Sequence, residues 1–178
     1  MDFDRFVAPL EYPVYVLTVA GTGGGSPAGC LVGFATQCSI APRRFLVCLS
    51  RANHTYRAAR GVAVAAVHLL GTADRDLAVL FGTGTGDEID KFEHCEWFNG
   101  PGGVPLLARC PGWLVGSIDG RLDLGDHEGL LLRPTHVGPG NGAAPLTSSA
   151  MTGLDAGHAA VVRWGTGPDE GPYRARGR

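Results

Sequence analysis

The sequence predicts a mainly β domain, a barrel of six strands with short helices capping it. Glycine occurs 28 times in 178 residues without the repeat of a collagen, and such a glycine content favours many tight turns. Apolar runs of strand length follow one another along the chain, and only short helical patterns interrupt them. This order favours a barrel over a sheet built from βαβ units.

The first three strands are expected in the N-terminal third of the chain. Residues 12–21, YPVYVLTVAG, are β-branched and aromatic and end at glycine. The glycine-rich residues 21–27 form a flexible turn, because a dinucleotide-binding loop would have to open a helix and strand-like sequence follows instead. Residues 29–40, stopped by Pro42, and residues 43–50 are the second and third strands.

Two short helices and a buried strand follow. Asn53 is a good N-cap, and the alanines and arginines after it predict a helix that ends at Gly61. Residues 62–70, VAVAAVHLL, are apolar throughout, which predicts a strand buried on both faces. Residues 72–82 carry leucines and a phenylalanine at helical spacing and predict the second helix.

The remaining chain divides into a long loop, two strands and a tail. Residues 83–108 have no clear period, and loops of this length in compact domains usually cover or form a site. Residues 110–138 predict two strands joined by a turn rich in glycine and aspartate. We expect one domain over residues 1–165 and a flexible tail over residues 166–178.

Composition argues against several classes of partner. The net charge is −2 and no basic block occurs, so we expect neither nucleic acid nor a membrane surface as partner. The first residues lack the pattern of a signal peptide, and the longest run of apolar residues and glycines, 28–35, is too short to cross a bilayer. We therefore expect a cytoplasmic protein.

The cysteines and histidines do not predict a metal site. The five cysteines form no C-x-x-C pair, so we expect reduced, buried thiols, with disulfide or metal roles as the alternatives. His94, Cys95 and Glu96 form one short cluster without a second ligand-bearing segment. His68 ends an apolar run and is expected to be a core histidine with satisfied hydrogen bonds.

Four stretches, in this order, resemble the flavin reductase family of FMN-binding split barrels. Residues 29–42, GCLVGFATQCSIAP, stand where the family has G-x-T-A-N-S-F-x-S-x-S-x-x-P-P. Residues 45–55, FLVCLSRANHT, match a strand followed by a turn that ends in S-x-T. DKF at 90–92, before a P-x-L segment at 105–107, and GDH at 125–127 complete the resemblance.

The resemblance implies a fold and an activity. The fold is a six-stranded Greek-key split barrel that forms a homodimer with the flavin at the subunit interface. The activity is an NAD(P)H-dependent flavin reductase, an oxidoreductase that transfers hydride from NAD(P)H to FMN or FAD and supplies reduced flavin to a partner monooxygenase. The alternatives are a non-catalytic flavin- or haem-binding split barrel and a deazaflavin-dependent reductase.

The resemblance also implies a shelf for the flavin ring along the second strand. Small residues let a backbone approach a flat ring closely; a plain core strand is the alternative. Because Leu31, Val32, Gly33 and Phe34 replace the family's T-A-N-S, only backbone contacts carry over at those positions. The implied ring-binding residues are Gly29, Leu31, Val32, Gly33, Phe34, Thr36 and Gln37.

The other implied site residues lie in three later segments. The phosphate site comprises Ser50, Arg51, Asn53 and Thr55, at the start of a helix whose amides favour an anion; simple N-capping by Asn53 is compatible with it. Lys91 and Phe92 would lie in the long loop near the flavin, or be an exposed lysine beside a loop anchor. His127, the candidate catalytic residue, would position the nicotinamide, with a solvated turn histidine as the alternative.

Overall fold

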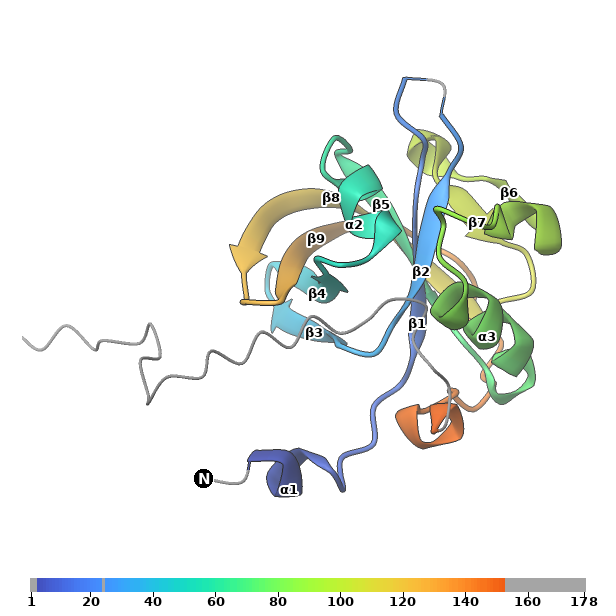
Figure 1. The fold of residues 1–178 in the computed structure, drawn as a ribbon. Coiled ribbons are helices and arrows are strands. Elements are labelled where there is room, and N and C mark those ends of the chain that lie inside the picture. The colour runs from blue at the N-terminus through green and yellow to red at the C-terminus, as the bar shows by residue number, and fades with distance from the viewer. Residues whose placement is uncertain (1–2, 24, 153–178) are drawn as a thin grey trace, which may run out of the picture.

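The computed structural model describes residues 3–23 and 25–152 (Figure 1). Within these ranges three α-helices accompany the strands: α1 (Phe3–Val7), α2 (His54–Ala59) and α3 (Arg75–Thr83). The strands are β1 (Tyr15–Val19), β2 (Ala28–Val32), β3 (Ala35–Ile40), β4 (Arg43–Ser50), β5 (Val64–Leu69), β6 (Trp97–Asn99), β7 (Pro105–Leu107), β8 (Gly112–Asp123) and β9 (His127–Val137). The mainly β class with short helices is thus confirmed.

Seven of these strands form one antiparallel sheet that curls into a barrel. Their order is β2-β1-β5-β8-β9-β4-β3, and β6 pairs with β7 separately. The two end strands, β2 and β3, are consecutive in the chain and are joined only by Gly33 and Phe34. The ends of the sheet therefore meet at this corner without pairing to each other, and within the part of the chain that the structure describes each end strand has one backbone edge without a strand partner.

The strand count differs from the expected six because residues 29–40 are two strands. A bend at Gly33 and Phe34 separates β2 from β3, and the chain passes there from one end of the sheet to the other. Residues 43–50, expected as the third strand, are β4 as predicted. The hydrophobic pattern runs through the bend, so the local sequence gave no sign of it.

The two faces of the central strands pack into different apolar clusters: one lies inside the barrel, one outside it against α3, and a smaller one joins Ala66 and Val115 to Val104 and Leu106. In β1, Leu17 and Val19 point into the barrel, whereas Val16 packs outside it with α3. The outer core joins the sheet to α3, to β7 and to Leu146. Because β1 and β5 are covered on both faces, their sequences are apolar without alternation, which confirms the expectation for residues 62–70.

His68 of β5 is fully buried and both ring nitrogens have partners. Its Nδ1 lies 3.1 Å from the carbonyl oxygen of Val16, and its Nε2 lies 3.1 Å from the amide nitrogen of Leu107. The amide can only donate, so Nε2 accepts and Nδ1 carries the proton. The prediction of a core histidine with satisfied hydrogen bonds is confirmed. Through the bond from Leu107, His68 also links β7 to the barrel.

The long segment 83–108 is folded onto the outer core. It contains a short 3₁₀-helix at Lys91–His94 and the β6–β7 hairpin. Figure 1 shows this hairpin and α3 on the same side of the barrel, away from the β8–β9 hairpin. The expectation of an open loop was wrong here, because pairing between residues 97–99 and 105–107 is invisible in the local sequence pattern.

Three further expectations concern exposure and boundaries. Cys30 is buried as expected, but Cys38 is exposed, since it lies on the end strand β3. Among residues 3–23 and 25–152, no helix has the length and apolar character needed to cross a membrane. The predicted tail at 166–178, and residues 153–165 of the predicted domain, lie outside the described residues.

Candidate flavin-binding site

A cleft of about 590 Å³ opens at the corner where β2 turns into β3. Its volume is within the range of small-molecule and cofactor sites, about 300–1,000 Å³. It is lined by the end of β2 and the bend, by the end of β4 with the turn into α2, and by the tip of the β8–β9 hairpin. These residues are Cys30, Leu31, Val32, Gly33, Phe34, Cys48, Leu49, Ser50, Arg51, Ala52, Asn53, Asp126 and His127.

Three of the sequence-predicted segments therefore converge on one cleft. Leu31 to Phe34, the predicted ring shelf, form one wall, and Ser50, Arg51 and Asn53, from the predicted phosphate site, form another. His127, the predicted catalytic residue, adjoins both segments, because it pairs with Ser50 in the β4–β9 ladder and its ring meets the Phe34 ring. These segments are far apart in sequence, and the antiparallel pairing of β4 with β9 brings the second and third together.

Gly33 keeps the wall at the bend open. Among residues 3–23 and 25–152, no heavy atom lies within 4 Å of the position that a Cβ would take at Gly33. Next to it, the Phe34 side chain is 57% exposed. The amide of Cys48 donates to the carbonyl oxygen of Phe34 at 2.9 Å, which fixes the bend against β4. A flat ligand could approach this backbone without meeting a side chain at position 33.

Gly29 is a different case, although it lies in the same strand. A Cβ at Gly29 would come within 2.8 Å of the Phe81 ring of α3. Gly29 does not line the cleft; it lines a second cavity of about 350 Å³ toward the start of β2. The structure thus explains this glycine by helix packing rather than by an approaching ring.

His127 is held from two sides. Its Nδ1 lies 2.8 Å from Oδ1 of Asp126, and its ring meets the Phe34 ring edge-on with 5.5 Å between centroids. The hydrogen bond to His127 lowers the pKa of the Asp126 carboxyl. With Nδ1 bound to the carboxylate, Nε2 is the nitrogen left for a ligand in the cleft.

The turn between β4 and α2 contributes capping and polar groups. Oδ1 of Asn53 accepts from the Thr55 amide at 3.0 Å, which confirms Asn53 as the N-cap. The Asn53 side-chain NH₂ group is a separate donor at the cleft wall. Thr55 itself is buried and does not line the cleft; its side chain hydrogen-bonds to Cys30, whose pKa is raised to about 11, chiefly by burial.

Lys91 and Phe92 lie behind β2. Lys91 is only 4% exposed, and its Nζ donates to the carbonyl oxygens of Gly29 at 3.2 Å and Phe81 at 3.1 Å. Burial lowers the pKa of this amine. Phe92 packs edge-on between Phe81 and Trp97. Both residues line the second cavity rather than the cleft, so the structure gives them a packing role that the loop prediction missed.

Thr36 and Gln37 lie on the other side of Phe34. They line a third cavity of about 640 Å³ together with aromatic residues of β1 and β4, and Phe34 and Cys48 border both this cavity and the cleft. The structure therefore does not bring Thr36 and Gln37 to the cleft with the other predicted ring-binding residues.

Sequence reasoning overlooked several residues that line the cleft, among them Cys48 and Asp126. Asp126 could have been predicted from the GDH triplet, since a carboxylate beside a histidine commonly orients the imidazole ring. Cys48 could have been predicted from strand alternation, because it precedes Ser50 by two residues and so lies on the same face of β4. The cluster at His94, Cys95 and Glu96 lines a separate surface hollow with Arg109.

The chemistry of the cleft suits a flat molecule with an apolar body and polar edges. Leu31, Val32 and Phe34 supply apolar surface, and His127 and Asn53 supply hydrogen-bonding groups at its borders. The edge of β2 that has no strand partner adds backbone donors and acceptors. This combination defines a split barrel with a corner site for a planar ligand.

Comparison with known proteins assigns the chain to a family. The flavin reductase like domain family matches residues 7–151, and the chain belongs to it. The chain is 28% identical to the FMN reductase (NADH) RutF of Pseudomonas syringae pv. syringae (strain B728a) over 150 residues. The aligned region covers 82% of this chain and 80% of that protein.

Two further proteins are similar. The stachydrine N-demethylase reductase subunit Stc3 of Rhizobium meliloti (strain 1021) is 26% identical over 125 residues, 70% of this chain. This chain spans only 53% of the length of Stc3. The crystal structure of a flavin reductase domain protein from Arthrobacter sp. FB24 superposes with a TM-score of 0.73 at 26% identity, over 82% of this chain and 87% of that one.

Proposed function

We propose that this protein is an NAD(P)H-dependent flavin reductase that binds FMN or FAD in the corner cleft. The observation that carries the proposal is that the open backbone at Gly33 and the His127 side chain line one cleft of about 590 Å³. The family membership and the name of the RutF relative, an NADH-dependent FMN reductase, point to the same activity.

The residues present fit a flavin. The ring system is flat and largely apolar, with carbonyl and nitrogen groups along its edges, and the cleft offers a bare backbone, apolar walls and peripheral donors. When bound, the flavin supplies the position that accepts hydride from the reduced nicotinamide.

The residues of this chain supply binding and orientation. Hydride transfer needs two flat rings held about 3–3.5 Å apart, so the walls at Val32 and Gly33 act by leaving that space free. His127, fixed by Asp126, presents Nε2 to the nicotinamide carboxamide. Asn53 donates from its side chain to the ribityl or phosphate portion. With both rings bound, direct hydride transfer would require no proton transfer by these residues, so their role would be to bind and orient.

We also propose a homodimer and an oxygenase partner. The cleft mouth carries the exposed Phe34, and the neighbouring end strand β3 carries Ile40, which is also exposed. A second copy covering this corner would shield the flavin from water. Because the similar protein Stc3 is named as a reductase subunit of a demethylase, we infer that reduced flavin passes from this protein to a partner monooxygenase.

The test is oxidation of NADH and NADPH by the purified protein with and without added FMN or FAD. We expect oxidation that depends on added flavin and saturates with its concentration. Flavin binding without oxidation of either nucleotide would favour a non-catalytic flavin-binding protein. Failure to bind FMN, FAD or a deazaflavin at high concentration would contradict the proposal as a whole.

A further inference from the structure

The tip of the β8–β9 hairpin is a tight turn that carries His127 to the cleft. Gly125 has a positive φ of 90° and its amide donates to Oδ1 of Asp123 at 3.0 Å. The amide of Leu124 donates to the carbonyl oxygen of His127 at 3.1 Å. These bonds shape the turn, but they do not attach it to the opposite wall of the cleft.

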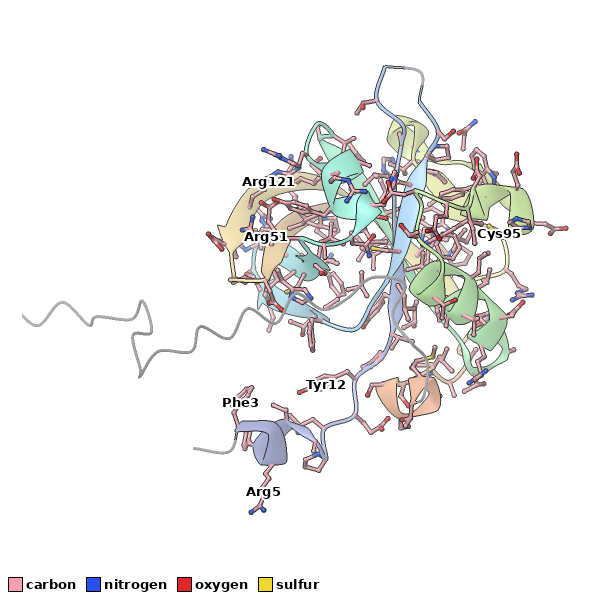
Figure 2. The ribbon with its side chains drawn as sticks, viewed as in Figure 1. Phe3, Arg5, Tyr12, Arg51, Cys95 and Arg121 are labelled. Atoms are coloured by element: carbon pink, nitrogen blue, oxygen red, sulfur yellow. The ribbon has the colours of Figure 1, made fainter. Side chains whose placement is uncertain are left out.

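Besides the β4–β9 ladder, in which Ser50 pairs with His127, the side chain of Arg51 ties the tip to the β4–α2 turn. Its Nε donates to the carbonyl oxygen of Gly125 at 2.9 Å, and its Nη2 donates to Oδ1 of Asp123 at 3.0 Å. The backbone amide of Arg51 donates to the carbonyl oxygen of Asp126 at 2.9 Å. One residue of the β4–α2 turn thus bonds to three residues of the hairpin tip, two through its side chain and one through its backbone amide. Figure 2 shows the Arg51 side chain on the side of the barrel where this hairpin lies.

The third nitrogen of the guanidinium is also occupied. Nη1 donates to the hydroxyl of Tyr56 at 3.0 Å, on α2. All three nitrogens of Arg51 are therefore committed to the protein, in a planar fork that a lysine could not reproduce. A phosphate group bound at Arg51 would have to compete with the Asp123 carboxylate for the same donors.

We propose that Arg51 is a positioning residue that fixes His127 toward the cleft, rather than a ligand of the flavin phosphate. The expected effect on kinetics rests on the proposed function. The attachment of Arg51 to the hairpin tip can be measured without flavin. Asp123 belongs to the same hydrogen-bond network, because its Oδ1 accepts from both the Arg51 guanidinium and the Gly125 amide. The effects of changing Arg51 and Asp123 should therefore be less than additive.

The first experiment is hydrogen–deuterium exchange of the flavin-free protein, read in the peptide that covers residues 120–130. Loss of Arg51 contacts in Arg51→Gln should speed exchange in this peptide about five- to tenfold, the range for one or two net hydrogen bonds. Arg51→Lys should recover part of the protection. The matched control is Arg133→Gln. Arg133 lies on β9 away from the tip and pairs with Asp119 of β8, so its loss should leave exchange in residues 120–130 unchanged.

The second experiment separates positioning from phosphate binding. Dissociation constants for FMN and for riboflavin, which lacks the phosphate, are compared with the KM for the nicotinamide nucleotide. Arg51→Gln should raise that KM or lower kcat, and the largely exposed Asp123→Asn should do so to a smaller degree. The dissociation constant for FMN should stay within about threefold of the wild-type value. A threefold change corresponds to about half of the 1.4 kcal/mol that a tenfold change represents.

Opposite results would overturn the inference. Unchanged exchange at residues 120–130 in Arg51→Gln would show that Arg51 does not hold the tip. Weaker binding of FMN but not of riboflavin, with Asp123→Asn behaving as wild type, would identify Arg51 as a phosphate ligand. A wild-type protein that oxidises no nucleotide would refute the proposed function alone, because the exchange result would stand independently.

Discussion

At the scale of single residues, the protein uses position more than chemical reactivity. Of the described residues, two cysteines line the cleft and neither thiol is activated: burial raises the pKa of Cys30 to about 11 and also raises the pKa of Cys48. His127 is oriented by Asp126 and by the Phe34 ring. Such an arrangement suits hydride transfer between two bound rings, where the protein must place groups and need not react itself.

The first prediction concerns His127. In His127→Asn the proposed hydrogen bond from Nε2 to the nicotinamide would be lost, whereas the backbone wall at Gly33 is untouched. We expect kcat/KM for the nicotinamide nucleotide to fall about tenfold, the effect of one hydrogen bond of about 1–1.5 kcal/mol. Flavin affinity, measured by fluorescence titration, should be unchanged. Equal losses in flavin affinity and in kcat/KM would place His127 on the flavin instead.

A second prediction concerns the buried His68 and acid stability. Burial lowers its pKa from 6.5 to about 4, opposed in part by the hydrogen bond to Val16. The unfolded chain therefore binds a proton at higher pH than the folded chain does. The contribution of neutral His68 is complete above pH 6.5 and is lost as the pH falls toward 4, a loss of up to about 3 kcal/mol.

Urea unfolding across this pH range checks the prediction. His68→Gln lacks the titrating group, so its free energy of unfolding should decline less steeply between pH 6.5 and 4 than that of the wild type. His136→Gln, at an exposed position on β9, is the matched control and should keep the wild-type slope. The same slope in all three proteins would contradict the assignment.

At the scale of elements, β2 shows why a sequence pattern can suggest a site without locating it. The glycines at 29 and 33 look alike in sequence. In the structure Gly29 makes room for Phe81 of α3, whereas Gly33 faces open space. The distinction depends on where α3 packs, which no local pattern in residues 28–40 contains.

Alanine substitutions at the two glycines should therefore have different effects. Gly29→Ala forces a methyl group against the Phe81 ring and should lower the free energy of unfolding by about 1–3 kcal/mol. Gly33→Ala meets no neighbour within 4 Å and should change it by less than about 0.5 kcal/mol. Denaturant unfolding compares them directly, and an equal cost at both positions would refute this description of the strand.

The elements with strong local signals could be predicted, and those made by distant pairing could not. The boundaries of β4 and the Asn53 cap follow from local residues, and the structure agrees with both. Burial of Lys91 depends on β2 and α3, where the carbonyl oxygens of Gly29 and Phe81 accept from its Nζ, and both elements lie outside the segment around it. The same holds for Thr36 and Gln37, which the bend at Gly33 directs to a separate cavity.

At the scale of the whole molecule, the site is a consequence of how the barrel closes. The first and last strands of the sheet are neighbours in sequence, so the chain itself joins the two ends where hydrogen bonding does not. The cleft lies at that corner, and the β4–β9 pairing brings His127 to it beside Ser50. The resemblance in sequence identified the converging segments; the corner geometry explains why they converge.

The central claim is that the corner beside Gly33 receives the flavin ring, and a blocked-corner titration tests it most directly. FMN is titrated into the wild type and into Gly33→Leu while ring fluorescence is followed, with thermal unfolding as a check that both proteins fold alike. The wild type should show saturable binding, and Gly33→Leu should bind at least about tenfold more weakly, a difference of 1.4 kcal/mol or more. Equal affinities in two equally stable proteins would contradict the claim.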